Sequence, residues 1–96
     1  MNNCMNIEYY YKNIDPFGEA TKDYIAKKIA SVAKIVAVRD VNIEASRRKD
    51  GLFYLNVIVR AMDGSEYRAT ENSASVHASI DIIEEELKSQ IRRDTL

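Results

Sequence analysis

The sequence predicts an α+β domain with the order β-α-β-β-β-α, in which two helices pack on one face of a four-stranded mixed sheet. Three observations predict this fold. Two stretches carry apolar residues at helical spacing, four stretches carry them in alternation, and one alternating stretch precedes the first helix while three follow it. The chain has 96 residues, the length of one domain, so we expect residues 1–96 to form a single unit.

The first predicted strand covers residues 5–11. Its apolar face consists of four side chains that recur at every second position: Met5, Ile7, Tyr9 and Tyr11. Tyr10 therefore points to the opposite face. The alternation stops at residues 12–18, where Pro16 and Gly18 are both candidates for the start of a helix, since proline lacks the N–H that a first turn leaves unbonded.

The first predicted helix covers residues 19–36. Spacings of three and four residues place four side chains on one apolar stripe: Ile25, Ile29, Val32 and Val36. Lys27 and Lys34 lie seven residues apart and share a different face, and Lys28 lies beside the stripe. Because the segment carries four lysines and two carboxylates, it has a local positive charge.

Three further strands are predicted at residues 41–45, 52–61 and 66–71, because each stretch alternates. The middle one is the most regular, with one face formed by Phe53, Leu55, Val57, Val59 and Ala61. Residues 47–51, of which the first three are basic, form the turn before it. Residues 63–64, Asp-Gly, form a tight hairpin after it, since glycine tolerates a positive φ.

The second predicted helix covers about residues 74–93. Its apolar stripe consists of five side chains: Val76, Ile80, Ile83, Leu87 and Ile91. Ser73 or Ser75 can cap the helix by accepting a backbone N–H. Acidic residues occupy its first half and middle, and basic residues its end, where positive charge suits the helix dipole.

The order strand, helix, strand predicts a right-handed crossover between two parallel strands, followed by an antiparallel meander. Both helices must bury their stripes against the same face of the sheet. The other face then stays open, and we expect it to include Tyr54, Asn56, Arg60, Arg68 and Thr70.

The composition excludes several classes of protein. One cysteine, Cys4, allows no internal disulfide, and with one histidine, His77, it predicts no Cys/His metal site. We expect no cofactor, because no glycine-rich phosphate loop occurs, and no enzyme, because no nucleophile–base pair is evident. No apolar run is long enough for a membrane span and no signal peptide is evident, so we expect a cytoplasmic protein.

The net charge of −1 argues against a generic polyanion binder, but the charges are unevenly distributed. Basic residues on the two helices and on the turn at 47–49 could together contact phosphates and release counterions. The candidates are Lys27, Lys28, Lys34, Arg47, Arg48, Lys49, Lys88, Arg92 and Arg93. The alternative is an ordinary solvated surface with helical ion pairs such as Glu84–Lys88.

Three segments resemble the ribosome hibernation promoting factors, also called ribosome-associated inhibitors. Residues 5–7 with 12–14 resemble the opening strand and turn of that family, residues 24–29 its lysine-bearing first helix, and residues 78–81 with 86–92 its second helix. The resemblance covers about residues 5–93. It implies the short type of the family, since long members carry a further dimerisation domain.

The resemblance implies a non-enzymatic factor that binds the small ribosomal subunit and its rRNA near the decoding channel and represses translation in stressed or resting cells. We expect no membrane or DNA partner, and a monomer or weak homodimer. The near-neutral charge predicts weaker, more salt-sensitive binding than a basic relative would show. The alternative is a protein-interaction or dimerisation module that uses an edge strand or the open face, where Leu52, Tyr54 and Ile58 lie.

Overall fold

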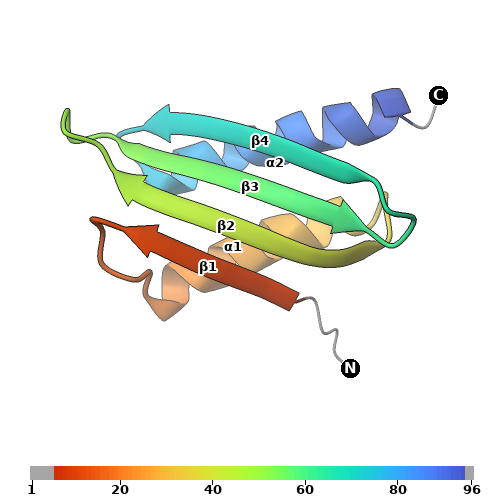
Figure 1. Ribbon diagram of the computed structural model, residues 1–96, viewed down its shortest axis with the longest axis horizontal. Helices are drawn as coiled ribbons and strands as arrows, with labels where there is room; N and C mark the ends of the chain where they lie inside the picture. The colour runs from red at the N-terminus through yellow and green to blue at the C-terminus, as the bar shows by residue number, and fades with distance from the viewer. Residues whose placement is uncertain (1–5, 95–96) are drawn as a thin grey trace.

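The structure is a computed structural model that describes residues 6–94. Its elements follow the predicted order: β1 (Asn6–Lys12), α1 (Glu19–Val32), β2 (Val38–Arg47), β3 (Phe53–Ala61), β4 (Glu66–Ser73) and α2 (Val76–Asp94). Both helices lie behind the same face of the four-stranded sheet (Figure 1). The predicted α+β fold class is therefore confirmed.

The strands lie side by side in sequence order, β1-β2-β3-β4. β1 and β2 are parallel, as the crossover through α1 requires, and the other two pairs are antiparallel. The C-terminal ends of β1 and β2 consequently meet at one end of the sheet, beside the β2–β3 turn. The α1–β2 connection and the β3–β4 turn lie at the opposite end (Figure 1).

The helix α1 ends at Val32, earlier than the predicted position 36. The N–H groups of Lys34 and Ile35 donate to carbonyls three residues back, at 3.3 and 3.0 Å, which tightens the chain and ends the α-helix. Val36 still packs against the core, but it does so from the connection to β2. Lys34 lies outside α1, so the prediction that it shares a helical face with Lys27 is wrong.

The strand β2 is longer than the predicted residues 41–45. Its register with β3 shifts between Val38 and Asp40, so Arg39 has no partner in the ladder. Such a bulge interrupts the alternation of faces and hides the start of a strand from a pattern of period two. The same bulge lets both Val38 and Val41 contact the core.

The other boundaries differ from the predicted ones by one or two residues. β1 and β4 extend to Lys12 and Ser73, β3 begins at Phe53, and α2 begins at Val76. Ser75 caps α2, since its Oγ accepts the backbone N–H of Ala78 at 3.2 Å. Cys4, and Met5 of the first predicted strand, lie outside the described residues.

The core lies between the sheet and the two helices. Both predicted helical stripes contribute to it, and the most deeply buried side chains include Ile25, Val32, Val41, Ile43, Leu55, Val57, Val59 and Leu87, each with no exposed surface. Because apolar burial is the main favourable contribution to folding, this layer fixes the relative positions of sheet and helices. The charged side chains at its margins are positioned accordingly.

The two edges of the sheet differ. On β4, the amide of Gln90 from α2 forms two hydrogen bonds with one residue: Arg68 N–H donates to Oε1 at 3.2 Å, and Nε2 donates to Arg68 O at 2.6 Å. At the other edge, β1 pairs only with β2 within the described residues. The β4 edge is thus occupied by a side chain at Arg68, and within the described residues the outer edge of β1 has no strand paired to it.

The face of the sheet away from the helices is polar and internally hydrogen-bonded. Asn56 Nδ2 donates to Glu44 Oε1 at 3.1 Å, and Thr70 Oγ1 donates to Asn56 Oδ1 at 2.9 Å. Ile58 lies on this face but keeps only 6% of its surface exposed. The centre of the open face is therefore a hydrogen-bonded polar surface, although Tyr10 on β1 is 49% exposed.

Candidate nucleic-acid interface

The nine predicted phosphate-binding residues lie in several separate regions of the molecule. Lys28 and Lys88 lie at the seam between α1 and α2, and Lys27 lies on the exposed surface of α1. Lys34, in the α1–β2 connection, lies at the end of the sheet opposite the β2–β3 turn (Figure 1). The remaining five lie either near the end of α2 or at the end of β2 and in the turn that follows it: Arg92, Arg93, Arg47, Arg48 and Lys49.

The two lysines at the helix seam share acidic partners. Lys28 Nζ lies 3.2 Å from Asp81 Oδ1 and 3.6 Å from Glu84 Oε1. Lys88 Nζ lies 3.3 Å from Glu84 Oε2, which confirms the predicted pair four residues apart on α2. The Glu84 side chain is only 11% exposed, so this carboxylate is held between two ammonium groups. Both lysines are therefore partly neutralised by the protein itself.

An aromatic pair extends the seam. The hydroxyl of Tyr24 donates a short hydrogen bond to Asp81, and the Tyr24 ring lies 4.5 Å from the His77 ring, centroid to centroid. Lys28 Nζ lies 5.2 Å from the centroid of the same Tyr24 ring, within range of a cation–π contact. Asp81 therefore accepts a hydrogen bond from the Tyr24 hydroxyl and forms an ion pair with Lys28. These contacts join α1 to α2.

These contacts shift the pKa values of the groups involved. The hydrogen bond from Tyr24, reinforced by Lys28, holds the pKa of Asp81 below its usual value. Burial raises the pKa of Glu84, but hydrogen bonds from Ser31 and Lys88 outweigh it, so the net shift is downward. The hydrogen bond to Asp81 raises the pKa of Lys28. All three groups stay charged at neutral pH, as a stable ion-pair network requires.

The second cluster forms where β1 and β2 end. Lys12 is opposite Ser46 in the parallel register, which places it beside Arg47, the last residue of β2. The β2–β3 turn then adds Arg48 and Lys49. We call Lys12, Arg47, Arg48 and Lys49 the sheet-end cluster.

The turn that carries this cluster is held by its own hydrogen bonds. Arg48 N–H donates to Leu52 O at 2.8 Å, and Gly51 N–H donates to Arg48 O at 3.0 Å. Asp50 Oδ1 accepts the N–H of Leu52 at 3.1 Å, a bond that lowers the pKa of Asp50. Gly51 has a φ of +88°, which an L side chain would adopt only with strain. The positions of the basic residues are therefore fixed by the backbone.

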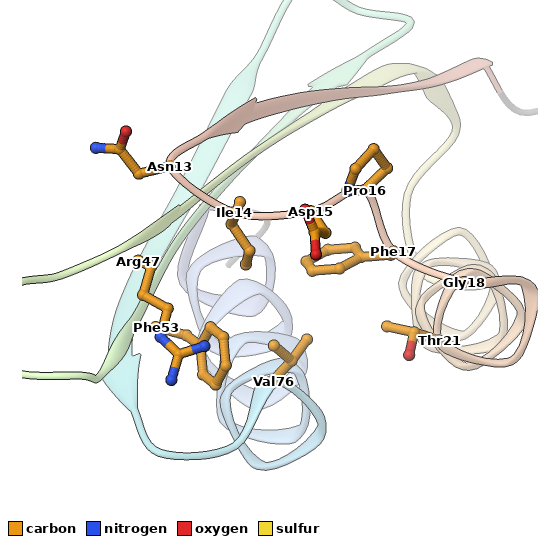
Figure 2. A pocket seen from close by; sticks show the side chains of 10 residues that line it. All are labelled: Asn13, Ile14, Asp15, Pro16, Phe17, Gly18, Thr21, Arg47, Phe53 and Val76. Atoms are coloured by element: carbon orange, nitrogen blue, oxygen red, sulfur yellow. The ribbon is translucent and has the colours of Figure 1, made fainter.

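A hollow of about 740 Å³ lies next to the sheet-end cluster (Figure 2). The Arg47 guanidinium lies at its rim, 4.9 Å from the centroid of the Phe53 ring. Figure 2 shows Phe17, Phe53 and Val76 around the hollow and Asn13 turned away from it. The hollow brings together the β1–α1 loop, the first turn of α1, the ends of β2 and β3 and the start of α2: Asn13, Ile14, Asp15, Pro16, Phe17, Gly18, Thr21, Arg47, Phe53 and Val76.

A second hollow, of about 460 Å³, lies on the other side of Arg47. It is lined by Lys12, Arg48 and Lys49 among others, and it shares Asn13 and Arg47 with the first hollow. The two hollows therefore border each other along the end of the sheet. By contrast, the gap between the helices at Lys28 holds only about 10 Å³, so the seam has no comparable space.

The remaining predicted cations are exposed and scattered. Arg93 Nη1 donates to Ser89 Oγ at 2.9 Å, and Arg92 lies beside it at the end of α2. Within residues 6–94, no cluster of three or more His, Cys, Asp or Glu side chains could hold a metal ion. No helix in this part of the chain is long and apolar enough to cross a membrane. The site chemistry that these residues offer is the binding of anions by charge and hydrogen bonds.

The sequence reasoning missed Lys12. The predicted parallel pairing of the first two strands implied that their ends would meet, so the signal was present in the topology. It also missed that Asp81 would join Glu84 as a partner of Lys28, because such a contact depends on how α1 packs on α2. Spacing within one helix could predict only the Glu84–Lys88 pair.

Comparisons with known proteins agree with this architecture. Residues 7–95 match the family described as sigma 54 modulation protein / S30EA ribosomal protein. The N-terminal domain of Protein Y from Thermus thermophilus is similar in structure, with a TM-score of 0.80 at 24% identity, covering 94% of this chain and 99% of that one. A ribosomal subunit interface protein from Coxiella burnetii has a TM-score of 0.79 at 17% identity, covering 95% and 98%. No curated protein sequence matches.

Proposed function

The chain belongs to the sigma 54 modulation protein / S30EA ribosomal protein family, the ribosome hibernation family that its sequence resembles, and from this we propose a specific role. It binds the small ribosomal subunit near the decoding channel, contacts rRNA there and represses translation during stress or dormancy. The protein acts in the cytoplasm by occupying space, and no reaction is part of the proposal.

The family match carries this proposal, because it covers residues 7–95 and so includes every described element. The shared fold supports it. One of the two similar structures is named a ribosomal subunit interface protein, and an interface between subunits is where a blocking factor would have to bind.

Charge and shape supply the binding in this proposal. Lys and Arg side chains that contact rRNA phosphates release counterions, and contacts of this kind read the backbone and its shape rather than the base sequence. The proposed contacts are Lys27, Lys28, Lys34, Arg47, Arg48, Lys49, Lys88, Arg92 and Arg93. Because the whole chain carries a net charge of −1, the binding should weaken steeply as salt rises.

A protein-interaction module on the same scaffold is the second candidate. The observation that favours it is the unpaired outer edge of β1 within the described residues. The open face gives it little support, because Ile58 is covered by its polar neighbours. Light scattering at high concentration tests self-association directly: the mass of a monomer there would weigh against this candidate.

Co-sedimentation with purified ribosomal subunits tests the proposed function. The full chain is mixed with small or large subunits at several salt concentrations, and the pellets are analysed. We expect the chain to pellet with the small subunit at low salt and to dissociate as salt rises. Absence of the chain from the small-subunit pellet even at low salt would contradict the proposal, and equal pelleting with both subunits would contradict its specificity.

A further inference from the structure

We propose that the sheet-end cluster, with the two hollows beside it, binds the phosphate backbone of a single-stranded RNA segment. The inference rests on the proposed function, which supplies RNA as the partner, and it assigns the main phosphate contacts to one end of the sheet instead of to the helix seam. Four cations from two separate segments converge there: Lys12, Arg47, Arg48 and Lys49.

The balance of charges favours the sheet end. Four cations of the cluster face two carboxylates, Asp15 and Asp50, of the neighbouring loops. Asp50 is paired with Arg48, Nε to Oδ2 at 3.2 Å. Within the described residues Lys12 and Lys49 have no acidic partner, and Arg47 contacts only the Phe53 ring. Three cations are therefore available to a ligand.

The helix seam has the opposite balance. Lys28 and Lys88 lie within 3.2 to 3.6 Å of Asp81 and Glu84, so a phosphate would have to compete with carboxylates already in place. The whole of α2 carries five carboxylates and three basic residues, which adds repulsion for a polyanion. The same motif lysines that the sequence highlights are thus poorly placed for a strong phosphate contact.

The shape of the sheet end suits an extended strand. The hollows of about 740 and 460 Å³ border each other at Arg47, so a chain can run from one to the other past the guanidinium. A guanidinium presents a fork of N–H donors that matches phosphate oxygens, and Arg47 is steadied by the Phe53 ring. The rings of Phe53 and Phe17 at the first hollow are only partly buried and offer apolar surface to a base.

An acidic protein segment is the other polyanion that could use this charge. RNA fits better, because partly exposed rings border the basic residues and provide contacts that a row of carboxylates cannot use. A duplex fits less well, since the hollows are recesses that an unpaired strand can enter. The inference is therefore specific to unpaired RNA.

Fluorescence anisotropy with a short labelled uridine oligomer tests this inference on the full chain. The double variant Lys12→Ala/Lys49→Ala removes two cations that have no partner within the described residues. We expect about tenfold weaker binding at low salt and a salt dependence whose slope falls by about 1.4, or ~0.7 for each lost phosphate contact of a single strand. Arg47→Gln, which removes one charge, should weaken binding by a smaller factor.

The matched control is Arg39→Ala/Arg68→Ala, which removes two exposed cations that belong neither to the sheet-end cluster nor to the nine proposed rRNA contacts. Both double variants have the same net charge, so a difference between them reports position. We expect less than twofold weakening for the control. Equal weakening in both, or stronger weakening in the control, would overturn the inference, as would better competition by a glutamate oligomer than by unlabelled RNA. Thermal unfolding verifies that both variants are folded.

The outcome separates this inference from the proposed function. If the unmodified chain sediments with small subunits but loses nothing through Lys12→Ala/Lys49→Ala, the inference fails and the proposed function stands. If the chain binds the oligomer through the sheet end but does not sediment with ribosomes, the proposed function fails and the inference about RNA stands.

Discussion

The helix seam and the sheet-end cluster contain the same kinds of basic side chain in different surroundings. At the seam, Lys28 and Lys88 are side by side with Asp81 and Glu84, and the gap between the helices is almost filled. At the sheet end, Lys12, Arg47 and Lys49 border open hollows, and among the described residues only Arg48 of this cluster has a carboxylate partner. One region uses its charge to join two helices, and the other leaves its charge to solvent.

The comparison shows that a count of lysines does not measure the capacity of a surface to bind phosphate. A lysine that is paired with a carboxylate must first leave that partner, so it gains less from contacting a phosphate than an unpaired lysine does. Local charge along the sequence made the first helix one of the candidates. The partners that decide availability lie on α2 and become visible only when the two helices are packed together.

The largest expected effect comes from opening the helix seam. Leu87 belongs to α2, has no exposed surface and faces α1 and the sheet. Leu87→Ala should lower the free energy of unfolding by about 3 kcal/mol, since it removes buried methyl groups and leaves a cavity. Lys49→Ala at the sheet end should change it by less than about 0.5 kcal/mol, because no packed group is lost. Urea denaturation of both variants measures the contrast, and similar losses would contradict it.

A smaller effect is expected from releasing the seam lysines. Glu84→Gln removes the carboxylate that Lys28 and Lys88 share, so both should become available and RNA binding should tighten by about two- to fivefold at low salt. Glu85→Gln is the matched control, because it removes one negative charge from an exposed position of the same helix. Equal tightening in the two variants would show that net charge alone decides, and the distinction between the two regions would fail.

The carboxylates of Asp81 and Glu84 also make the free energy of unfolding depend on pH. Since the folded pKa values of Asp81 and Glu84 lie below their ordinary values of 3.8 and 4.5, their contribution is fully present above those values and is lost as the pH falls through the folded pKa values. Urea denaturation between pH 6 and about pH 3 should show this loss. The loss should be smaller in Glu84→Gln, and an unchanged pH dependence would contradict the ion-pair network.

The smallest expected effect is the contribution of Glu86 to the pH dependence of stability, and its sign is opposite to that of Asp81 and Glu84. Burial, together with the nearby carboxylate of Glu71, raises the pKa of Glu86 on the side of α2 next to β4. A raised folded pKa means that stability is greater at low pH and falls as the pH rises through that value. Glu86→Gln should therefore be slightly more stable than the unmodified chain at pH 7, and the difference should vanish in acid. A less stable variant at pH 7 would show that Glu86 makes a favourable contact.

The sequence predicts the arrangement of elements well because the apolar periods are strong. Ile25, Ile29 and Val32 occupy the helical stripe that they predict, and the alternation in β3 is regular. Boundaries are predicted less well where local backbone chemistry decides. The bulge at Arg39 breaks the alternation in β2, and the hydrogen bonds after Val32 end α1 although Val36 continues its spacing.

The candidate site is less predictable than the fold. The run at 47–49 is visible as three adjacent basic residues, but its neighbour Lys12 is brought there by the parallel register of two distant strands. Likewise, Lys28 looks like an exposed cation until Asp81, far along the chain, is placed against it. Charge identity is local information, whereas charge pairing across elements is a property of the packed molecule.

The amide of Gln90 has a consequence for assembly. A carboxamide presents one donor and one acceptor, as a peptide group does, so on Arg68 it takes the place of one residue of a fifth strand. A strand that approached β4 would first have to displace it, whereas β1 presents no such obstacle within the described residues. We therefore expect an incoming peptide or another copy to pair with β1 more readily than with β4 at Arg68.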